Sequence, residues 1–266
     1  MAYVSPLLTN MVSIVKKVAI NLNRDFSEIE RLQTSIKGSL DFTRIAFDKV
    51  QKAIASEFAK FGGVYPVVLA GQSAQNKNAY FSVSAVDGIA NFAHGNPDFA
   101  ISVALVDNGM VVDAVIYNPA RDELFFAEKG KGAYREGFRS HERLRVSSKQ
   151  DLEGALIAVK PDVNNKEDSF KLINNVIEAT SEVRVSGSLA LDLAYVAAGK
   201  LDAVIAPNAM QASYAAGLLL IKEAGGMVLD MDQKDTRSED VQMVLNSGNL
   251  MAVNFNLSQK IAKVLK

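Results

Sequence analysis

The sequence contains no cysteine, which excludes disulfide bonds, thiolate metal sites and catalytic thiols. Its two histidines, His94 and His141, lie too far from other ligand-type residues to indicate a zinc site. There is no excess charge of either sign, because 29 Lys and Arg balance 30 Asp and Glu, so no overall field attracts nucleic acid or an anionic membrane. No apolar run approaches the ~18 residues of a membrane span, and the first residues lack a secretory leader pattern. These absences predict a protein of the reducing cytoplasm.

The 266-residue chain is long enough for one large or two modest layered domains, and its 48% hydrophobic and 22% charged residues are typical of folded domains. Apolar residues at helical spacing predict helices over 5–23 and 41–60, with a loop or short hairpin at 33–42. From residue 99 the period changes to two, and Asn108-Gly109 predicts a hairpin within an antiparallel sheet.

Beyond residue 150, strands and helices alternate, which predicts a sheet covered by helices. The expected strands are 155–159, 183–185, 201–206, 227–230 and 251–254, and the expected helices are 166–179, 188–198, 211–224 and 257–265. No linker-like tract marks a boundary. We therefore expect two closely packed halves, an N-terminal α+β half over 1–150 with paired helices and an antiparallel sheet, and a C-terminal α/β half over 151–266.

The stretch from Phe81 to Phe99 carries the strongest sign of chemistry. A buried strand over 81–86 ends at Asp87-Gly88, which places one carboxylate at the end of that strand. A helix turn beginning at Ile89 would direct its free amides to the same place, and a carboxylate beside an anion is the usual setting of a Mg²⁺-bridged phosphate. The simpler alternative is a strand and a helix with Asp87 as a cap, and this stretch alone leaves both open.

Four runs, in order along the chain, carry a family resemblance: VDGIANFAHGNPDFAISVAL, VIYNPARDELFFAEKGKGAY, RVSGSLALDLAYVAAGKLDA and AAGLLLIKEAGGMV. Together they make the chain resemble the inositol monophosphatase family, particularly its bacterial extragenic-suppressor branch. The resemblance implies a five-layered αβαβα sandwich of α/β (α+β) class that forms a homodimer. It also implies hydrolysis of small phosphate monoesters with Mg²⁺, which holds the phosphate and activates water.

The residues that hold Mg²⁺ in the resembled family are mostly replaced in this chain. Only Asp87 keeps its carboxylate as a metal ligand. Because Mg²⁺ prefers several charged oxygen ligands, one aspartate among amides and hydroxyls predicts weak metal binding and slow or absent hydrolysis. Four carboxylate positions fall on Gln72, Ser84, Ser213 and Phe47, and the threonine that helps to prepare the attacking water falls on Ile89.

A phosphate or sulfate pocket depends on backbone amides rather than on particular side chains. Its predicted donors are Gly88 and Ile89 after the first strand, and Gly187 and Ser188 before a later helix. The resembled family has a small residue at the position of Leu189, so the larger leucine side chain is expected to crowd the predicted anion site.

Other candidates favour structural roles. Lys37 lies in a loop that the family places near the active site, but a solvated lysine is the simpler interpretation. His94 fits a turn, and Asp192 fits a helix cap or an interface. A basic cluster interleaved with glutamates fits a solvated face before it fits an RNA site; its members are Arg135, Arg139, Arg143 and Arg145.

We therefore expect a pseudo-enzyme, a homodimeric phosphatase scaffold retained for binding or regulation. Its expected ligands are a small anion or a protein partner, the latter in the transcription machinery by family analogy, and we expect no tightly bound cofactor. The alternative is an active Mg²⁺-dependent phosphatase for inositol phosphate or a similar monoester, with Asp87 assisted by Asp48 or Asp41. A third interpretation is a structural partner of an intact paralogue.

Overall fold

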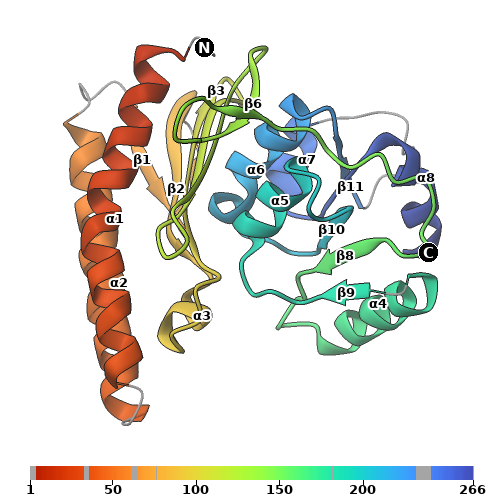
Figure 1. The fold of residues 1–266 in the computed structure, drawn as a ribbon, viewed down its shortest axis with the longest axis horizontal. Coiled ribbons are helices and arrows are strands. Elements are labelled where there is room, and N and C mark those ends of the chain that lie inside the picture. Colours follow the sequence, from red (N-terminus) through yellow and green to blue (C-terminus); the bar gives the residue numbers. More distant parts are fainter. Residues whose placement is uncertain are drawn as a thin grey trace.

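The computed structural model describes residues 4–32, 36–60, 65–75, 77–180, 182–231 and 241–265, without the side chains of 30–32, 36–40 and 241–243. Its elements form five layers, which are helices, sheet, helices, sheet and helices from left to right in Figure 1. The predicted αβαβα sandwich is therefore confirmed. Among the described helices, none combines the length and the apolar character that a bilayer crossing needs.

Two long helices, α1 (Pro6–Leu32) and α2 (Ile36–Ala59), form the first layer. The predicted first helix is confirmed, and it continues to Leu32 because its apolar stripe continues through the buried Phe26 and Ile29. The loop predicted at 33–42 is wrong from Ile36 onward. Gly38 lowers the helix propensity there, but local propensity is a weak signal that tertiary packing outweighs.

The first sheet has seven strands whose spatial order follows the sequence. β1 runs parallel to β2, and every other neighbouring pair is antiparallel. The predicted hairpin is confirmed, because Asn108 and Gly109 adopt the positive φ values of 49° and 76° that a tight turn requires. The strands are β1 (Val67–Leu69), β2 (Ala79–Asp87), β3 (Ala100–Asp107), β4 (Met110–Asn118), β5 (Glu123–Glu128), β6 (Gly132–Arg135) and β7 (Glu142–Arg143).

The second sheet has five strands, and the alternation predicted beyond residue 150 is confirmed. Its outer face is covered by α4 (Lys166–Ala179) and α8 (Phe255–Val264). A short helix, α7 (Val241–Ser247), was not predicted. In spatial order the strands are β11 (Met227–Asp230), β12 (Leu250–Val253), β10 (Ala203–Ala206), β8 (Leu156–Val159) and β9 (Glu182–Arg184).

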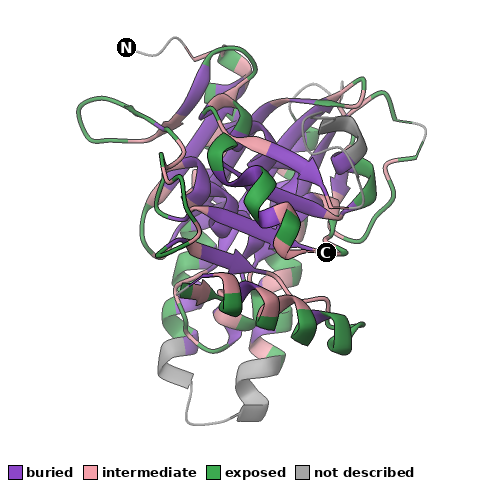
Figure 2. Cartoon of the chain, turned by 90° about the vertical axis from the view of Figure 1, so that its right-hand side faces the viewer, coloured by how far each residue is buried: buried purple, intermediate pink, exposed green. Residues whose placement is uncertain are grey.

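Helices α5 (Leu189–Ala197) and α6 (Gln211–Glu223) lie between the two sheets (Figure 1). Both are largely buried, as the purple interior of Figure 2 shows. They pack so closely that a side-chain carbon added to Gly217 would lie 2.5 Å from Leu193 Cδ1. This close contact makes α5 and α6 one packed central unit, and the end of β2 lies against that unit.

Candidate functional site

The candidate site lies where β2 meets the central helices. Phe81, Val83 and Ala85 of β2 pack in the core beneath α1 and α2, so strand alternation turns Ser84 to the opposite face. The register of β2 with β3 shifts between Ser84 and Asp87, and the carboxylate of Asp87 contacts α5. β2 thus carries two polar side chains to the face that covers α5 and α6.

Asp87 is buried, with 7% of its surface exposed, and both central helices hold its carboxylate. Its Oδ1 accepts from the Ser188 hydroxyl at 2.7 Å and from the Ala190 amide at 3.0 Å, and the nearby Ser213 hydroxyl acts to lower the pKa of the carboxylate. Burial raises the pKa of Asp87, and these donors partly offset that rise. The carboxylate therefore occupies the N-terminal turn of α5, where the helix dipole favours negative charge.

Lys160 supplies a positive charge near this carboxylate. It directly follows β8, is half-buried, and donates from Nζ to the carbonyl oxygens of Asn208 at 3.3 Å and Pro207 at 3.4 Å. Burial lowers the pKa of Lys160, while attraction to Asp162 and Asp87 opposes that shift. Sequence reasoning missed Lys160, although a lysine directly after a buried strand was a detectable signal.

The positions that correspond to metal ligands of the resembled family are only partly brought together. Ser213 reaches Asp87 from the first turn of α6, and Ser84 is buried on the same side of β2. Phe47 instead packs half-buried against the core between α1, α2 and the first sheet.

Gln72 and Ile89 lie at more open places. Gln72 is exposed, and its Oε1 accepts from the Leu69 amide at 3.0 Å. Ile89 opens the short helix α3 (Ile89–Ala93) and is 42% exposed. Neither side chain supplies a charged oxygen.

The side chains present do not fit a Mg²⁺ cluster. Across the residues that the structure describes, no group of three or more His, Cys, Asp or Glu side chains is placed to hold a metal ion. Asp41 and Asp48, the carboxylates proposed from sequence as substitutes, lie exposed on α2. Mg²⁺ requires a near-octahedral set of oxygens with sufficient charge, and Asp87 Oδ1 already accepts two hydrogen bonds from the protein.

Of the two predicted anion donors before α5, Ser188 is engaged within the chain. The Ser188 amide donates to the Ser186 hydroxyl at 3.2 Å, and the Ser188 hydroxyl donates to Asp87. Gly187 is closely covered, since a side-chain carbon on it would lie 3.1 Å from Asn91 Nδ2.

The other predicted donors, Gly88 and Ile89, lie at the start of α3. Gly88 has a φ of 85°, and a side-chain carbon there would lie 2.8 Å from the Asp98 carbonyl oxygen. Only glycine fits this position without strain. Anion binding at Gly88, Ile89, Gly187 and Ser188 stays a prediction.

Asp192 is a second buried carboxylate, in the first turn of α5. The Ser186 hydroxyl donates to its Oδ2 at 2.8 Å. Burial raises the pKa of Asp192 to about 7, and the charges of Asp87 and Asp98 add to the rise. Asp192 lines a pocket of about 300 Å³ together with the ion pair between Arg121 and Asp98, whose nearest N and O atoms lie 2.7 Å apart.

His94 and Lys37 are the two remaining candidates from the sequence. His94 Nδ1 lies 2.8 Å from the Ala90 carbonyl oxygen at the end of α3, which fits the structural turn role expected from sequence. The side chain of Lys37 lies outside the described residues.

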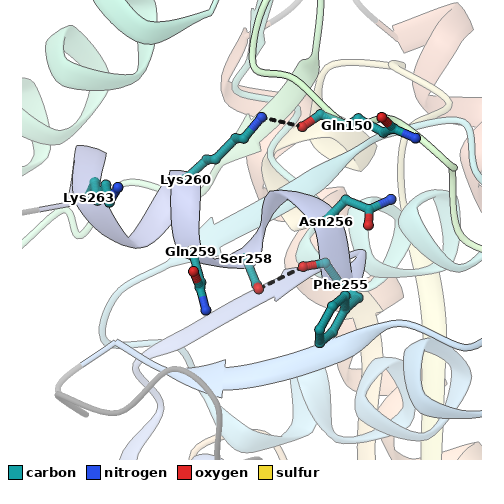
Figure 3. A pocket seen from close by; sticks show the side chains of 7 residues that line it. All are labelled: Gln150, Phe255, Asn256, Ser258, Gln259, Lys260 and Lys263. Atoms are coloured by element: carbon teal, nitrogen blue, oxygen red, sulfur yellow. Dashed lines mark hydrogen bonds between the residues drawn. The ribbon is translucent and has the colours of Figure 1, made fainter.

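A separate pocket of about 530 Å³ lies on α8, in the outermost layer (Figure 3). The Lys260 ammonium donates to the Gln150 carbonyl oxygen at 2.7 Å, and the Ser258 hydroxyl donates to the Phe255 carbonyl oxygen at 2.8 Å. The residues that line it include no carboxylate. It is therefore not an extension of the Asp87 site.

Comparison with known proteins agrees with the resemblance seen in the sequence. The model of the inositol monophosphatase family matches residues 8–266. The inositol-1-monophosphatase of Mesorhizobium japonicum is 38% identical over 268 residues, covering 98% of this chain and 97% of the relative. The Nus factor SuhB of Xylella fastidiosa is 30% identical over 264 residues, covering 98% and 94%. The crystal structure of the extragenic suppressor protein SuhB from Bartonella henselae matches with a TM-score of 0.82 and 32% identity over 99% of both chains. This chain belongs to the inositol monophosphatase family.

Proposed function

We propose that this chain is a catalytically impaired member of its family, a pseudo-phosphatase retained for binding or regulation. The observation that carries the proposal is the engagement of Asp87. It is the one carboxylate at the positions that correspond to metal ligands, and the Ser188 hydroxyl and the Ala190 amide donate to it from within the chain.

Electrostatics support this proposal. At an effective dielectric constant near 20, two unit charges about 4 Å apart attract by about 4 kcal/mol, and a divalent ion loses more than this with each missing carboxylate. Lys160 adds a positive charge that repels Mg²⁺ from the same region. Ile89 has no oxygen with which to orient a water molecule for attack.

A binding role is supported by the names of several relatives. Besides the protein of Xylella fastidiosa, the Nus factor SuhB of Escherichia coli is 32% identical over 232 residues. We infer a protein partner in the transcription machinery, a homodimer and a cytoplasmic location. A small anion at the start of α3 remains part of the proposal, and no tightly bound cofactor is needed.

The test is turnover of inositol 1-phosphate and p-nitrophenyl phosphate over millimolar Mg²⁺ and Mn²⁺. The Mesorhizobium japonicum relative, purified in the same way, serves as the positive control. We expect no turnover above the metal-only blank. Metal-dependent turnover comparable to that of the control would overturn the proposal.

The second candidate function is an active Mg²⁺-dependent phosphatase for a small phosphate monoester. The 38% identity to a protein named inositol-1-monophosphatase favours it. It requires Asp87 to leave its hydrogen bonds and to recruit Asp48 or Asp41 from α2. Turnover that is lost in Asp87→Asn and kept in Asp202→Asn would establish this function, since Asp202 binds Ser147 and Leu156 instead.

A further inference from the structure

The free edge of the first sheet carries arginines in an unusual arrangement. β7 is the last strand of this sheet, and Arg145 lies two residues beyond its end. Leu144 is buried, whereas Arg143 and Arg145 on either side of it are exposed, so both arginines point away from the core. Arg139, in the turn before β7, is exposed as well. We call Arg139, Arg143 and Arg145 the basic edge.

These three arginines are not neutralised by neighbouring acids. Among the described residues, no carboxylate lies within ion-pairing distance of any of them, whereas Arg135 on the preceding strand pairs with Glu142. Residues 135–149 contain five Lys or Arg against two Glu, in a chain with a net charge of −1. Positive charge is therefore concentrated in this segment, and within the described part of the chain Arg139, Arg143 and Arg145 have no acidic partner.

Aromatic rings accompany the basic edge. Phe138, in the same turn as Arg139, is 102% exposed, the largest exposure of any described large hydrophobic side chain. Tyr134 pairs with Arg143 across β6 and β7, is half-buried, and stacks on Phe126 with ring centroids 5.7 Å apart. The edge thus combines separate cations with the exposed aromatic ring of Phe138.

We propose that the basic edge, together with Phe138, binds single-stranded nucleic acid. Side chains two residues apart on an extended chain stand roughly 7 Å apart, so Arg143 and Arg145 reach successive points along a phosphate backbone. A base can stack on Phe138, because every base has a face that fits an aromatic ring.

An acidic protein surface fits this edge less well. Stable protein interfaces have an apolar centre surrounded by polar residues, whereas at this edge Leu144 is buried and Phe138 contributes a single exposed apolar side chain beside the arginines. A phosphate group can bind any accessible cation, and a base can stack on any exposed aromatic ring. This inference stands apart from the proposed loss of hydrolysis, since none of its residues lies at the Asp87 site.

The test is fluorescence anisotropy of the full chain with labelled mixed-sequence RNA and DNA single strands, at salt concentrations from about 50 to about 200 mM. For three phosphate contacts we expect a slope of log K against log salt of about −2, from about 0.7 per contact. Arg139→Gln, Arg143→Gln and Arg145→Gln should each flatten the slope by about 0.7. Phe138→Ala should weaken binding about five-fold or more without changing the slope.

The matched control is Arg184→Gln, because Arg184 is also an exposed arginine on a short edge strand but pairs with Glu182. Thermal melting of each variant shows whether it is folded. Equal loss of affinity in the control and the basic-edge variants would overturn the proposal, as would an absence of binding at the lowest salt. Binding of polyglutamate in preference to either nucleic acid would assign the edge to an acidic protein instead.

Discussion

Replacing Asp192 by asparagine should stabilise the protein at alkaline pH. Asp192 is 4% exposed, and its Oδ2 accepts one hydrogen bond, from Ser186. An asparagine oxygen can accept the same bond without carrying a charge. The amide nitrogen would face the pocket of about 300 Å³ that Asp192 lines, which has room for water.

The size of the effect follows from the pKa of Asp192. This pKa rises from 3.8 to about 7 on burial, so the folded state holds a proton that the unfolded state releases. The resulting stabilisation is complete below about pH 4 and is lost as the pH rises to about 7. At 1.36 kcal/mol per pKa unit, the ionised carboxylate costs the fold about 4 kcal/mol at pH 8. For an unfolding entropy near 2.1 cal/mol/K per residue, removing that cost raises the Tm by about 7 °C.

The assay is urea denaturation followed by circular dichroism at about pH 5 and about pH 8. Asp192→Asn should gain stability at the higher pH and much less at the lower one. Asp202→Asn is the control, because the Asp202 carboxylate accepts from the Ser147 hydroxyl at 2.6 Å and the Leu156 amide at 2.8 Å, and it should lose stability. A gain for Asp192→Asn that is the same at both pH values would refute the reasoning, because burial of charge would then not be its source.

Two other predictions concern packing and metal. Gly217→Ala should lower the free energy of unfolding by about 1–3 kcal/mol, because the added carbon would lie 2.5 Å from Leu193. Chemical denaturation measures this change in stability. An unchanged denaturation midpoint would contradict the tight contact between α5 and α6. Millimolar Mg²⁺ should change the Tm by less than about 1 °C, because an ion raises the Tm only if it binds the folded protein. A rise that disappears in Asp87→Asn would show a metal site at Asp87.

Much of the fold could be predicted because its signals are local. Asn108-Gly109 specifies a turn within two residues, and the helix predicted over 166–179 has the same bounds as α4. The start of α2 could not be predicted in this way, because the segment around Gly38 has a weak local helix propensity. Helix α7 spans only 7 residues, which is too short a segment to show a helical period.

The candidate site was harder to predict than the fold. The sequence predicted a site at Asp87 surrounded by positions without a carboxylate, and the structure places Ser213 near enough to lower the pKa of Asp87. The sequence did not reveal that Ser188, 101 residues further along the chain, would hold the same carboxylate. Lys160 was not predicted as a site residue because its charge matters only through its position near Asp87. That position depends on β8 ending near β2 and α6, which only the tertiary structure shows.

The buried setting of Asp87 also bears on how readily mutation could build a metal cluster around it. A single carboxylate introduced at Ser213 would remove a hydroxyl that stabilises the Asp87 carboxylate and place a like charge beside it, at a cost to the fold before any ion is bound. Folding stability therefore opposes that substitution on its own. A second acidic ligand at this place would have to arrive together with a compensating change, such as the gain of a further cation besides Lys160.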